Sequence, residues 1–176
     1  MDEVVKKEKR SCKDEALFWL EYGDRTEKEM VTHLVKKGYE EREIAECMAF
    51  LVDLSFIDDQ RYALKFVDVS MEKCRGPLRI RHELAEKGIK GEVVDQALEQ
   101  LYDRQTEREI ALTVAEKVYG SIQRDWDLSE EKQEYDDWGN PVLPKLSDKE
   151  KAKIARKLAT AGFSSGATYD AIGRLK

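Results

Sequence analysis

The sequence predicts an all-α protein built from three tandem three-helix repeats that form an elongated, curved, solenoid-like array. The first observation behind this prediction is a pattern in which a leucine is followed, one helical turn later, by a glycine and an apolar residue. It recurs as Leu34/Gly38/Tyr39, Leu84/Gly88/Ile89 and Leu158/Gly162/Phe163. Self-similarity of this kind is typical of repeat proteins. The second observation is that apolar residues recur at helical spacing, and no stretch alternates convincingly as a strand would, so essentially no sheet is expected.

Each repeat contains three amphipathic segments. The opening helices are predicted over 13–22, 59–73 and 106–119. The second helix of each repeat carries an apolar pair one turn apart on one face: Met30/Leu34, Ile80/Leu84 and Ile154/Leu158. The third follows the glycine, with apolar or small side chains at Ile44/Met48/Leu51, Val94/Leu98/Leu101 and Thr168/Ile172/Leu175. Because one unit hides these faces only partly, we expect neighbouring units to stack.

The ends of the second helices are marked in the sequence. Thr26-Glu-Lys-Glu29 and Ser147-Asp-Lys-Glu150 match the capping-box pattern, and Gly76-Pro77 places a proline in a first helical turn. Gly38, Gly88 and Gly162 lie where a helix ends in a left-handed residue, which costs glycine little. We therefore expect the apolar residue after each glycine to fold back onto the last turn.

These boundaries divide the chain into an N-terminal extension (1–12) and three repeats (13–57, 58–104 and 105–176). The third repeat carries an acidic insertion over 120–146, because its second helix starts later than in the other two. We interpret the insertion as a long, partly ordered loop or hairpin. It contains Trp126 and Trp138, which either anchor it on the body of the protein or contact a partner.

Composition narrows the class of protein. The chain has 176 residues, 39% of them charged and 41% hydrophobic, with a net charge of −6, as in helix-rich soluble proteins. No apolar run could span a membrane and no signal-peptide core is present, so a cytoplasmic location is expected. Cys12, Cys47 and Cys74 include no CxxC pair, which argues against a disulfide framework or a zinc site. No heptad stripe is exposed, so a monomer is expected.

No catalytic constellation, metal site or cofactor motif is visible. Asp58-Asp59 stands directly before a helical stretch, where aspartates are more often N-caps than a catalytic pair. His33 and His82 lack cysteines at suitable spacing and are expected on helix surfaces. The sequence contains neither of the glycine-rich phosphate-binding motifs G-x-x-x-x-G-K-[ST] and G-x-G-x-x-G. The protein is therefore not expected to be an enzyme.

Charge is distributed unevenly along the chain. Residues 13–57 and 120–146 are net acidic, whereas 71–90 and 147–176 are net basic. A helical array with basic middle and C-terminal units can place a positive strip along a groove. The candidate partner-binding residues of this strip are Arg61, Arg75, Arg79, Arg81, Lys87, Lys153, Arg156 and Lys157. The alternative is an ordinary solvated helix face.

The central repeat contains two distinctive stretches, Asp58-Asp59-Gln-Arg61-Tyr62-Ala63-x-x-Phe66-Val67 and Gly76-Pro77-x-Arg79-Ile80-x-x-Glu83-Leu84-x-x-Lys87-Gly88-Ile89. Together they resemble the signature of the RecX family. Supporting stretches are Arg25-Thr26-Glu27-Lys28-Glu29-Met30 and Lys157-Leu158-x-x-x-Gly162-Phe163. The helix-cap and family-motif residues are Asp58, Asp59, Gly38, Gly76, Gly88 and Gly162.

The resemblance implies a bacterial cytoplasmic modulator of homologous recombination and DNA repair with three three-helix repeats. Members of the family bind the RecA recombinase and its filament on single-stranded DNA, and they limit ATP hydrolysis, strand exchange and coprotease activity. They are not enzymes and need no cofactor. The acidic insertion and the net negative charge depart from this pattern and imply that any direct DNA contact is weak.

Two other functions stay open at this point. A DNA-binding regulator of the helix-turn-helix type could be built from short helices joined at glycine turns, although the last helices of the first two repeats carry no basic cluster. A helical-repeat adaptor for an unrelated partner is the second alternative.

Overall fold

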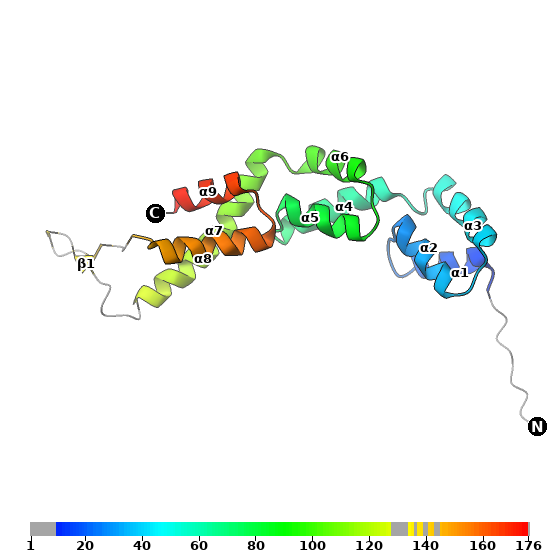
Figure 1. The fold of residues 1–176 in the computed structure, drawn as a ribbon, viewed down its shortest axis with the longest axis horizontal. Coiled ribbons are helices and arrows are strands. Elements are labelled where there is room, and N and C mark those ends of the chain that lie inside the picture. The colour runs from blue at the N-terminus through cyan, green and yellow to red at the C-terminus, as the bar shows by residue number, and fades with distance from the viewer. Residues whose placement is uncertain (1–9, 128–133, 136, 139–140, 143–144, 176) are drawn as a thin grey trace, which may run out of the picture.

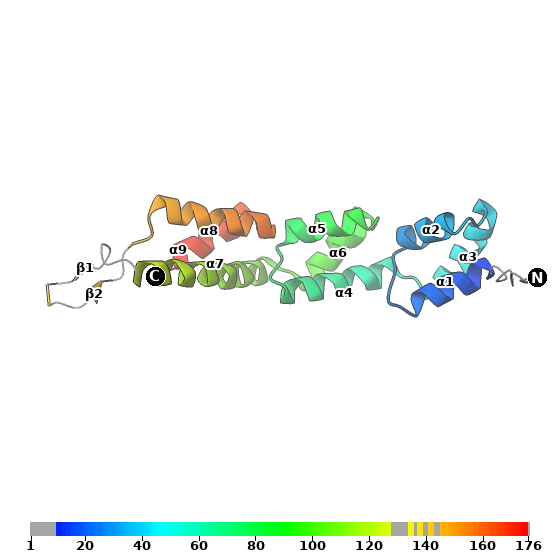
Figure 2. The same ribbon diagram turned by 90° about the horizontal axis from the view of Figure 1, so that it is seen from below.

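The computed structural model describes residues 10–127, 134–135, 137–138, 141–142 and 145–175, and these form a row of three helical units (Figures 1 and 2). Unit 1 contains α1 (Cys12–Leu20), α2 (Glu27–Lys36) and α3 (Glu41–Asp53). Unit 2 contains α4 (Asp59–Glu72), α5 (Pro77–Glu86) and α6 (Gly91–Leu101). Unit 3 contains α7 (Arg104–Asp127), α8 (Asp148–Ala161) and α9 (Ser165–Arg174). The predicted all-α fold of three-helix repeats is confirmed.

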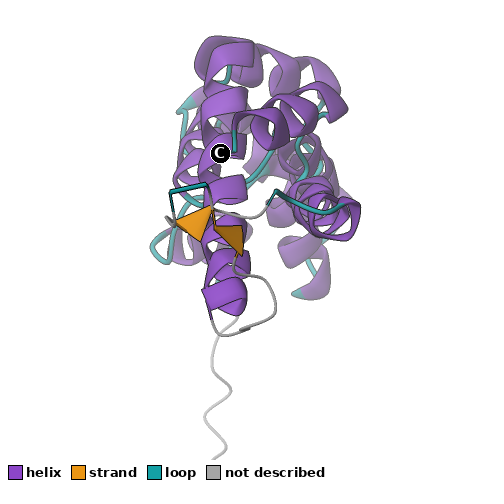
Figure 3. Ribbon diagram, turned by 90° about the vertical axis from the view of Figure 1, so that its left-hand side faces the viewer, coloured by secondary structure: helices purple, strands orange, loops and turns teal. Residues whose placement is uncertain are grey.

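The helices of the three units occupy equivalent positions along the array. Figure 2 shows the first helices, α1, α4 and α7, in one row and the second helices, α2, α5 and α8, in a parallel row beside it. Seen from its end, the array is narrow (Figure 3). The molecule therefore presents long faces made of equivalent helices rather than a compact globule.

The helix starts follow the sequence signals. The hydroxyls of Thr26 and Ser147 accept hydrogen bonds from the amides of Glu29 and Glu150, and both capping boxes are complete. Ser11, Asp58 and Ser164 cap α1, α4 and α9 through their side chains in the same way. Each cap satisfies a backbone N–H that has no partner within the helix.

The second helices end at the repeated glycines. Gly38, Gly88 and Gly162 have φ values of 75°, 86° and 88°, a region that side chains with a Cβ disfavour. The amides of the next residues donate back to carbonyl groups in the last turn: Tyr39 to Leu34, Ile89 to Leu84 and Phe163 to Leu158. This closure turns each apolar side chain into the core of its own unit.

Each unit has its own hydrophobic core. The first core includes Met30, Leu34 and Leu51, the second includes Val67, Ile80 and Leu84, and the third includes Ile154, Leu158 and Ala171. Helix packing occurs mainly within units, because the third helix of each unit packs across the first two and closes the core. Neighbouring units therefore share less apolar surface than we expected. Between unit 2 and unit 3, the shared residues are the partly buried Cys74 and Ile110.

The insertion begins later than the sequence predicted. Helix α7 continues through Asp127 instead of ending near 119, so Trp126 lies on a helix and not in a loop. The reason is that Val118, Ile122 and Trp126 continue the apolar stripe one turn at a time, and Trp126 is only 5% exposed. The acidic composition of this stretch had hidden that periodicity.

The described part of the remaining insertion contains a minimal hairpin. Strands β1 (Glu134–Tyr135) and β2 (Pro141–Val142) pair antiparallel, and they are the only strands in the described residues. This agrees with a loop or hairpin, although the sequence indicated no sheet. Trp138, between the strands, is 85% exposed. The N-terminal extension up to residue 9 and residues 128–133, 136, 139–140 and 143–144 of the insertion lie outside the described residues.

Candidate partner-binding groove

A groove follows the line between the row of first helices and the row of second helices. It consists of four hollows, and successive hollows share the lining residues Arg75, Lys157 and Lys153. The first hollow lies at the joint between unit 1 and unit 2, the next at the joint between unit 2 and unit 3, and the last two between α7 and α8. We call this feature the basic groove.

Cations dominate the lining of the basic groove. The basic side chains are Arg25, Lys28, Lys36, Lys73, Arg75, Arg79, Lys87, Lys117, Lys149, Lys153, Arg156 and Lys157. The acidic ones are Glu29, Glu72, Glu83, Glu86, Asp125 and Glu150. A concave surface lined mostly by one sign of charge concentrates its field on a partner of the other sign.

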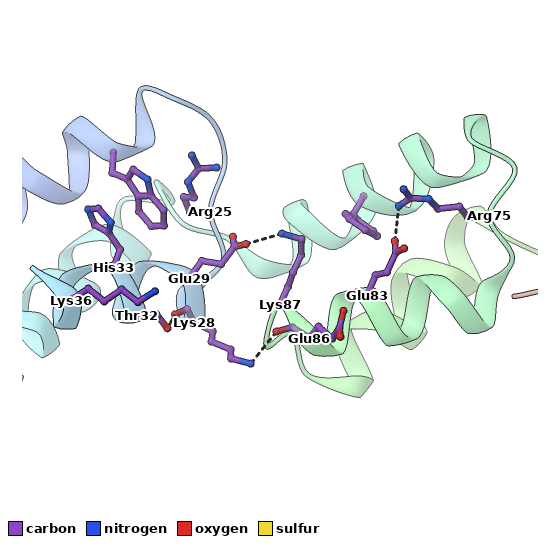
Figure 4. Close-up of a pocket in the computed structure, with 12 residues that line it drawn as sticks. Arg25, Lys28, Glu29, Thr32, His33, Lys36, Arg75, Glu83, Glu86 and Lys87 are labelled. Atoms are coloured by element: carbon purple, nitrogen blue, oxygen red, sulfur yellow. Dashed lines mark hydrogen bonds and ion pairs between the residues drawn. The ribbon is translucent and has the colours of Figure 1, made fainter. Parts of the chain in front are cut away.

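The first hollow is crossed by interactions between the two units (Figure 4). Nζ of Lys87 donates to Oε1 of Glu29 at 2.7 Å, and Nζ of Lys28 donates to the carbonyl oxygen of Glu86 at 3.0 Å. Burial lowers the pKa of Lys87, but its interactions with Glu29 and Tyr62 outweigh that effect and the net shift is upward. Lys87 is therefore a cation held at the joint, with part of its side chain open to the groove.

Aromatic side chains line the unit 1 side of this hollow. Trp19 stacks on His33 with ring centroids 4.1 Å apart, and the guanidinium of Arg25 lies 4.6 Å from the Trp19 ring centre. Nε of Arg25 is buried and has no hydrogen-bond partner within the described part of the chain. Because the Trp19 ring interacts with both His33 and Arg25, it is part of the wall rather than an open stacking platform.

In the centre of the groove, one carboxylate neutralises two arginines. Glu83 accepts from Arg75 at 2.5 Å and from Arg79 at 2.7 Å. Lys73, Lys117 and Lys157 line the same hollow without an ion pair among the described residues. The centre thus contains both pre-paired arginines and lysines that are available to a partner.

The distal part of the groove lies between α7 and α8. Lys153, Arg156 and Lys157 are exposed there and form no ion pair with the described residues. The helices are held together beside them by Trp126, whose Nε1 donates to Oε1 of Glu150 at 2.8 Å. Two packed helices therefore hold cations that have no ion pair among the described residues over a concave surface, which suits charge-assisted binding.

The structure brings six of the eight sequence-predicted strip residues to one groove: Arg75, Arg79, Lys87, Lys153, Arg156 and Lys157. It places the other two elsewhere. Arg61 is exposed beside the link between units 1 and 2, and its Nη2 donates to the carbonyl oxygen of Ser55 at 3.0 Å. Arg81 forms an ion pair with Asp95 of α6, on another side of α5.

Sequence reasoning did not select Lys73, Lys117 or Lys149, which also line the groove. Lys117 follows Glu116 on a helix of mixed charge, so no local cluster of basic residues marked it. Its place on the side of α7 that faces α8 is visible only in the structure, where Lys117 lines the same hollow as Lys157 of α8.

The two aspartates at the start of α4 have different roles. Oδ1 of Asp58 accepts from the amide of Arg61 at 2.9 Å and caps α4. Oδ1 of Asp59 instead accepts from the amide of Glu27 at 3.0 Å, at the start of α2 in the neighbouring unit. Burial raises the pKa of Asp59, and the Glu27 amide opposes that shift. Each carboxyl therefore binds a backbone amide at the start of a helix.

The remaining motif residues are structural in their contacts. Gly38 lies at the end of α2, Gly88 faces the side chain of Lys28 across the first joint, and Gly76 meets Gly162 across the second. In the described residues no helix is long and apolar enough to cross a membrane. Nor do the described side chains gather three or more potential metal ligands.

Comparison with known proteins identifies the first two units. Residues 12–51 match the model of the RecX first three-helix domain, and residues 58–98 match the RecX second three-helix domain. The chain is 34% identical over 112 residues to regulatory protein RecX of Vibrio campbellii, covering 64% of this chain and 71% of that protein. It is 27% identical over 169 residues to the RecX of Clostridium perfringens strain 13, covering 96% of this chain and 68% of that protein.

Solved structures show the same architecture. The crystal structure of RecX from Lactobacillus salivarius superposes with a TM-score of 0.76 at 28% identity, covering 93% of this chain and 94% of that one. A second regulatory protein RecX structure gives a TM-score of 0.73 at 25% identity, covering 93% of this chain and 70% of that one. Against RecX of Clostridium botulinum, which is 35% identical, the match spans about half of the relative's length (52%). The chain belongs to the RecX family of regulatory proteins.

Proposed function

We propose that this protein is a negative modulator of homologous recombination and DNA repair that acts in the cytoplasm. It binds RecA and the RecA filament on single-stranded DNA, and it inhibits ATP hydrolysis, strand exchange and coprotease activity. Membership of a family of regulatory proteins supports this proposal. The protein acts by occupying a surface of its partner and not by catalysis.

The observation that carries the proposal is the basic groove along an elongated body. A row of units with one cation-lined groove can contact several repeated subunits of a filament at once (Figure 2). Once the first contact with a filament has formed, each further contact with the same filament is effectively intramolecular, so the contacts together strengthen binding. The elongated body would lie along the groove of the RecA filament and hinder the conformational cycling of the recombinase or the entry of a second DNA strand.

We expect the basic groove to bind carboxylates on RecA more strongly than it binds free DNA. Glu83 and Glu29 already neutralise Arg75, Arg79 and Lys87 in the absence of a partner. A free DNA strand must therefore displace internal carboxylates for a screened electrostatic gain. We expect a monomer to bind the filament tightly and naked DNA weakly.

The direct test is a titration of the single-stranded-DNA-dependent ATPase of the cognate RecA with this protein. Suppression well below one modulator per recombinase favours capping of the filament end or a long-range block, and suppression near stoichiometric amounts favours occupancy of the filament groove. If an active recombinase is not inhibited by the folded protein, the proposal is wrong and an adaptor function takes its place.

The groove itself is tested with a double charge reversal, Lys153→Glu with Arg156→Glu. Both side chains are exposed and form no ion pair with the residues that the structure describes, so the variant is expected to fold normally and to lose inhibition. Lys151→Glu is the matched control, because Lys151 lies on the same helix but lines a different hollow between α7, α8 and α9. Equal inhibition by the double variant and the control would exclude the distal groove as the binding surface.

A further inference from the structure

The two joints between units are built differently. Across the joint between unit 2 and unit 3, the amide of Gly76 donates to the carbonyl oxygen of Ala161 at 2.7 Å, and the amide of Leu78 donates to that of Gly162 at 3.0 Å. A Cβ added at Gly76 would lie only 2.2 Å from backbone atoms of Gly162. Two backbone hydrogen bonds and this close approach therefore join unit 2 to unit 3.

The joint between unit 1 and unit 2 depends on side chains. Oγ1 of Thr26 donates to the carbonyl oxygen of Lys87 at 2.8 Å, and Asp59 accepts from the Glu27 amide. The ion pair of Lys65 with Asp24, at 2.7 Å, also crosses the joint. Within the described ranges, no backbone–backbone hydrogen bond joins these two units, and no hydrophobic cluster includes residues of both.

Lys87 belongs to the first joint and to the basic groove at the same time. Its Nζ holds Glu29 of unit 1, while its side chain is 30% exposed and lines the hollow shown in Figure 4. A phosphate group that enters this hollow competes directly with Glu29 for the same ammonium group. The Lys87–Glu29 pair is only partly buried, with side-chain exposures of 30% and 31%, so a phosphate can reach it, and the displacement of Glu29 keeps the binding of a free strand weak.

We propose that the joint between unit 1 and unit 2 is an articulation that opens when the phosphates of a nucleic-acid strand in the groove draw Lys87 away from Glu29. A linear chain of phosphates matches a linear row of cations better than a single anion does. Unit 1 then moves as a separate body, while units 2 and 3 stay together. The part of this proposal that concerns the ligand rests on the proposed function, in which the basic groove is a binding surface. The part that concerns the joint does not.

The test is ¹⁵N relaxation of backbone amides in the full chain, which reports the rotational tumbling of each unit. At low salt and without ligand, we expect all three units to tumble as one elongated body. A short oligothymidylate should shorten the correlation time of unit 1 relative to units 2 and 3. Sodium chloride should do the same at higher concentration because it screens the ion pairs of the joint.

Two variants separate the joint from the ligand. Glu29→Gln removes the negative charge that holds Lys87 but keeps the capping box of α2, since glutamine also serves at that position. We expect unit 1 of this variant to tumble separately without any ligand. Arg81→Gln is the control, because the pair of Arg81 with Asp95 lies within unit 2, and this variant should tumble as one body.

The outcomes are distinct. Common tumbling of all units in Glu29→Gln and at high salt would overturn the articulation. If unit 1 tumbles separately in Glu29→Gln and at high salt, the articulation stands. If unit 1 is then released by an oligo-aspartate peptide but not by oligothymidylate, the ligand is an acidic protein surface and the phosphate ligand is overturned. Neither relaxation result depends on inhibition of the recombinase. A failure of the proposed function would therefore be detected in the ATPase titration and not in these measurements.

Discussion

Gly76 and Gly162, which lie far apart in the sequence, meet backbone to backbone where unit 2 joins unit 3. The amide of Gly76 donates to the carbonyl oxygen of Ala161 at 2.7 Å, and a Cβ at Gly76 would collide with backbone atoms of Gly162. The φ of Gly76 is −79°, a value that residues with a side chain also adopt. Glycine is required at this position because there is no space for a side chain. The joint therefore depends on the absence of a side chain.

Gly76→Ala should destabilise the contact between units 2 and 3. Backbone atoms cannot yield as a flexible side chain can, so we expect a loss of about 1–3 kcal/mol in the free energy of unfolding, measured by urea denaturation. Gly120→Ala is the matched control, because nothing lies near its Cβ position inside α7. It should stabilise the protein by roughly 0.5–1 kcal/mol. Equal stability of the two variants would contradict the proposed close packing.

Trp126→Ala should loosen the end of α7 from the start of α8. The side chain is nearly buried, stacks edge-on against Tyr119 at 5.9 Å and donates to Glu150, so we expect a loss of roughly 3 kcal/mol on thermal unfolding. Trp126→Phe, which keeps a ring but loses the donor, should lose only about 1 kcal/mol. Trp138→Phe should have little effect on stability. A loss confined to Trp138→Phe would show that the anchor is in the hairpin.

Asp58→Ala and Asp59→Ala should have separable effects. Asp58 caps α4, and its loss should cost about 1 kcal/mol of stability without changing the first joint. Loss of Asp59 should instead expose the amide of Glu27, because Asp59 accepts its hydrogen bond from the other unit. Hydrogen exchange checks this: the Glu27 amide should exchange faster in Asp59→Ala only. Faster exchange in both variants would mean that the two carboxylates act together.

Unit 1 should lose stability in acid through Glu15. A hydrogen bond from Lys37 lowers the pKa of this buried carboxyl, burial opposes the shift, and His33 and Arg10 add to the lowering. The folded-state pKa therefore lies below the ordinary value of 4.5. The stabilisation is present above pH 4.5 and is lost as the pH falls through the lowered value, because the unfolded chain binds the proton first.

Glu15→Gln checks this assignment. Urea denaturation across the acidic range should show a flatter fall in the free energy of unfolding for Glu15→Gln than for the natural chain. Asp14→Asn, next to it but exposed, serves as the control. An unchanged acid profile in Glu15→Gln would show that other carboxyls cause the acid sensitivity.

Local signals were sufficient to predict most of the helices. Capping residues, the glycines at 38, 88 and 162, and apolar spacing act over a few neighbouring positions, so the sequence shows them directly. The exception was α7 beyond Gly120, where acidic composition outweighed the apolar stripe of Ile122 and Trp126 in our interpretation.

The joints and the groove could not be predicted in this way. Asp59 follows Asp58 immediately, yet one caps its own helix and the other caps a helix of the neighbouring unit. Arg79 and Arg81 are only two positions apart, yet only Arg79 lines the groove. The number of basic residues in a segment does not reveal which side of a helix faces a neighbour.

The sequence by itself determined the helical class, the repeat and the family, because each depends on residue types at short spacing. Only the tertiary structure decided that the three cores are separate, that one joint is made by backbone and the other by side chains, and that Lys87 serves both joint and groove. The physical reason is that helix formation is local, whereas docking depends on how whole helices present their surfaces across distances that no short motif encodes.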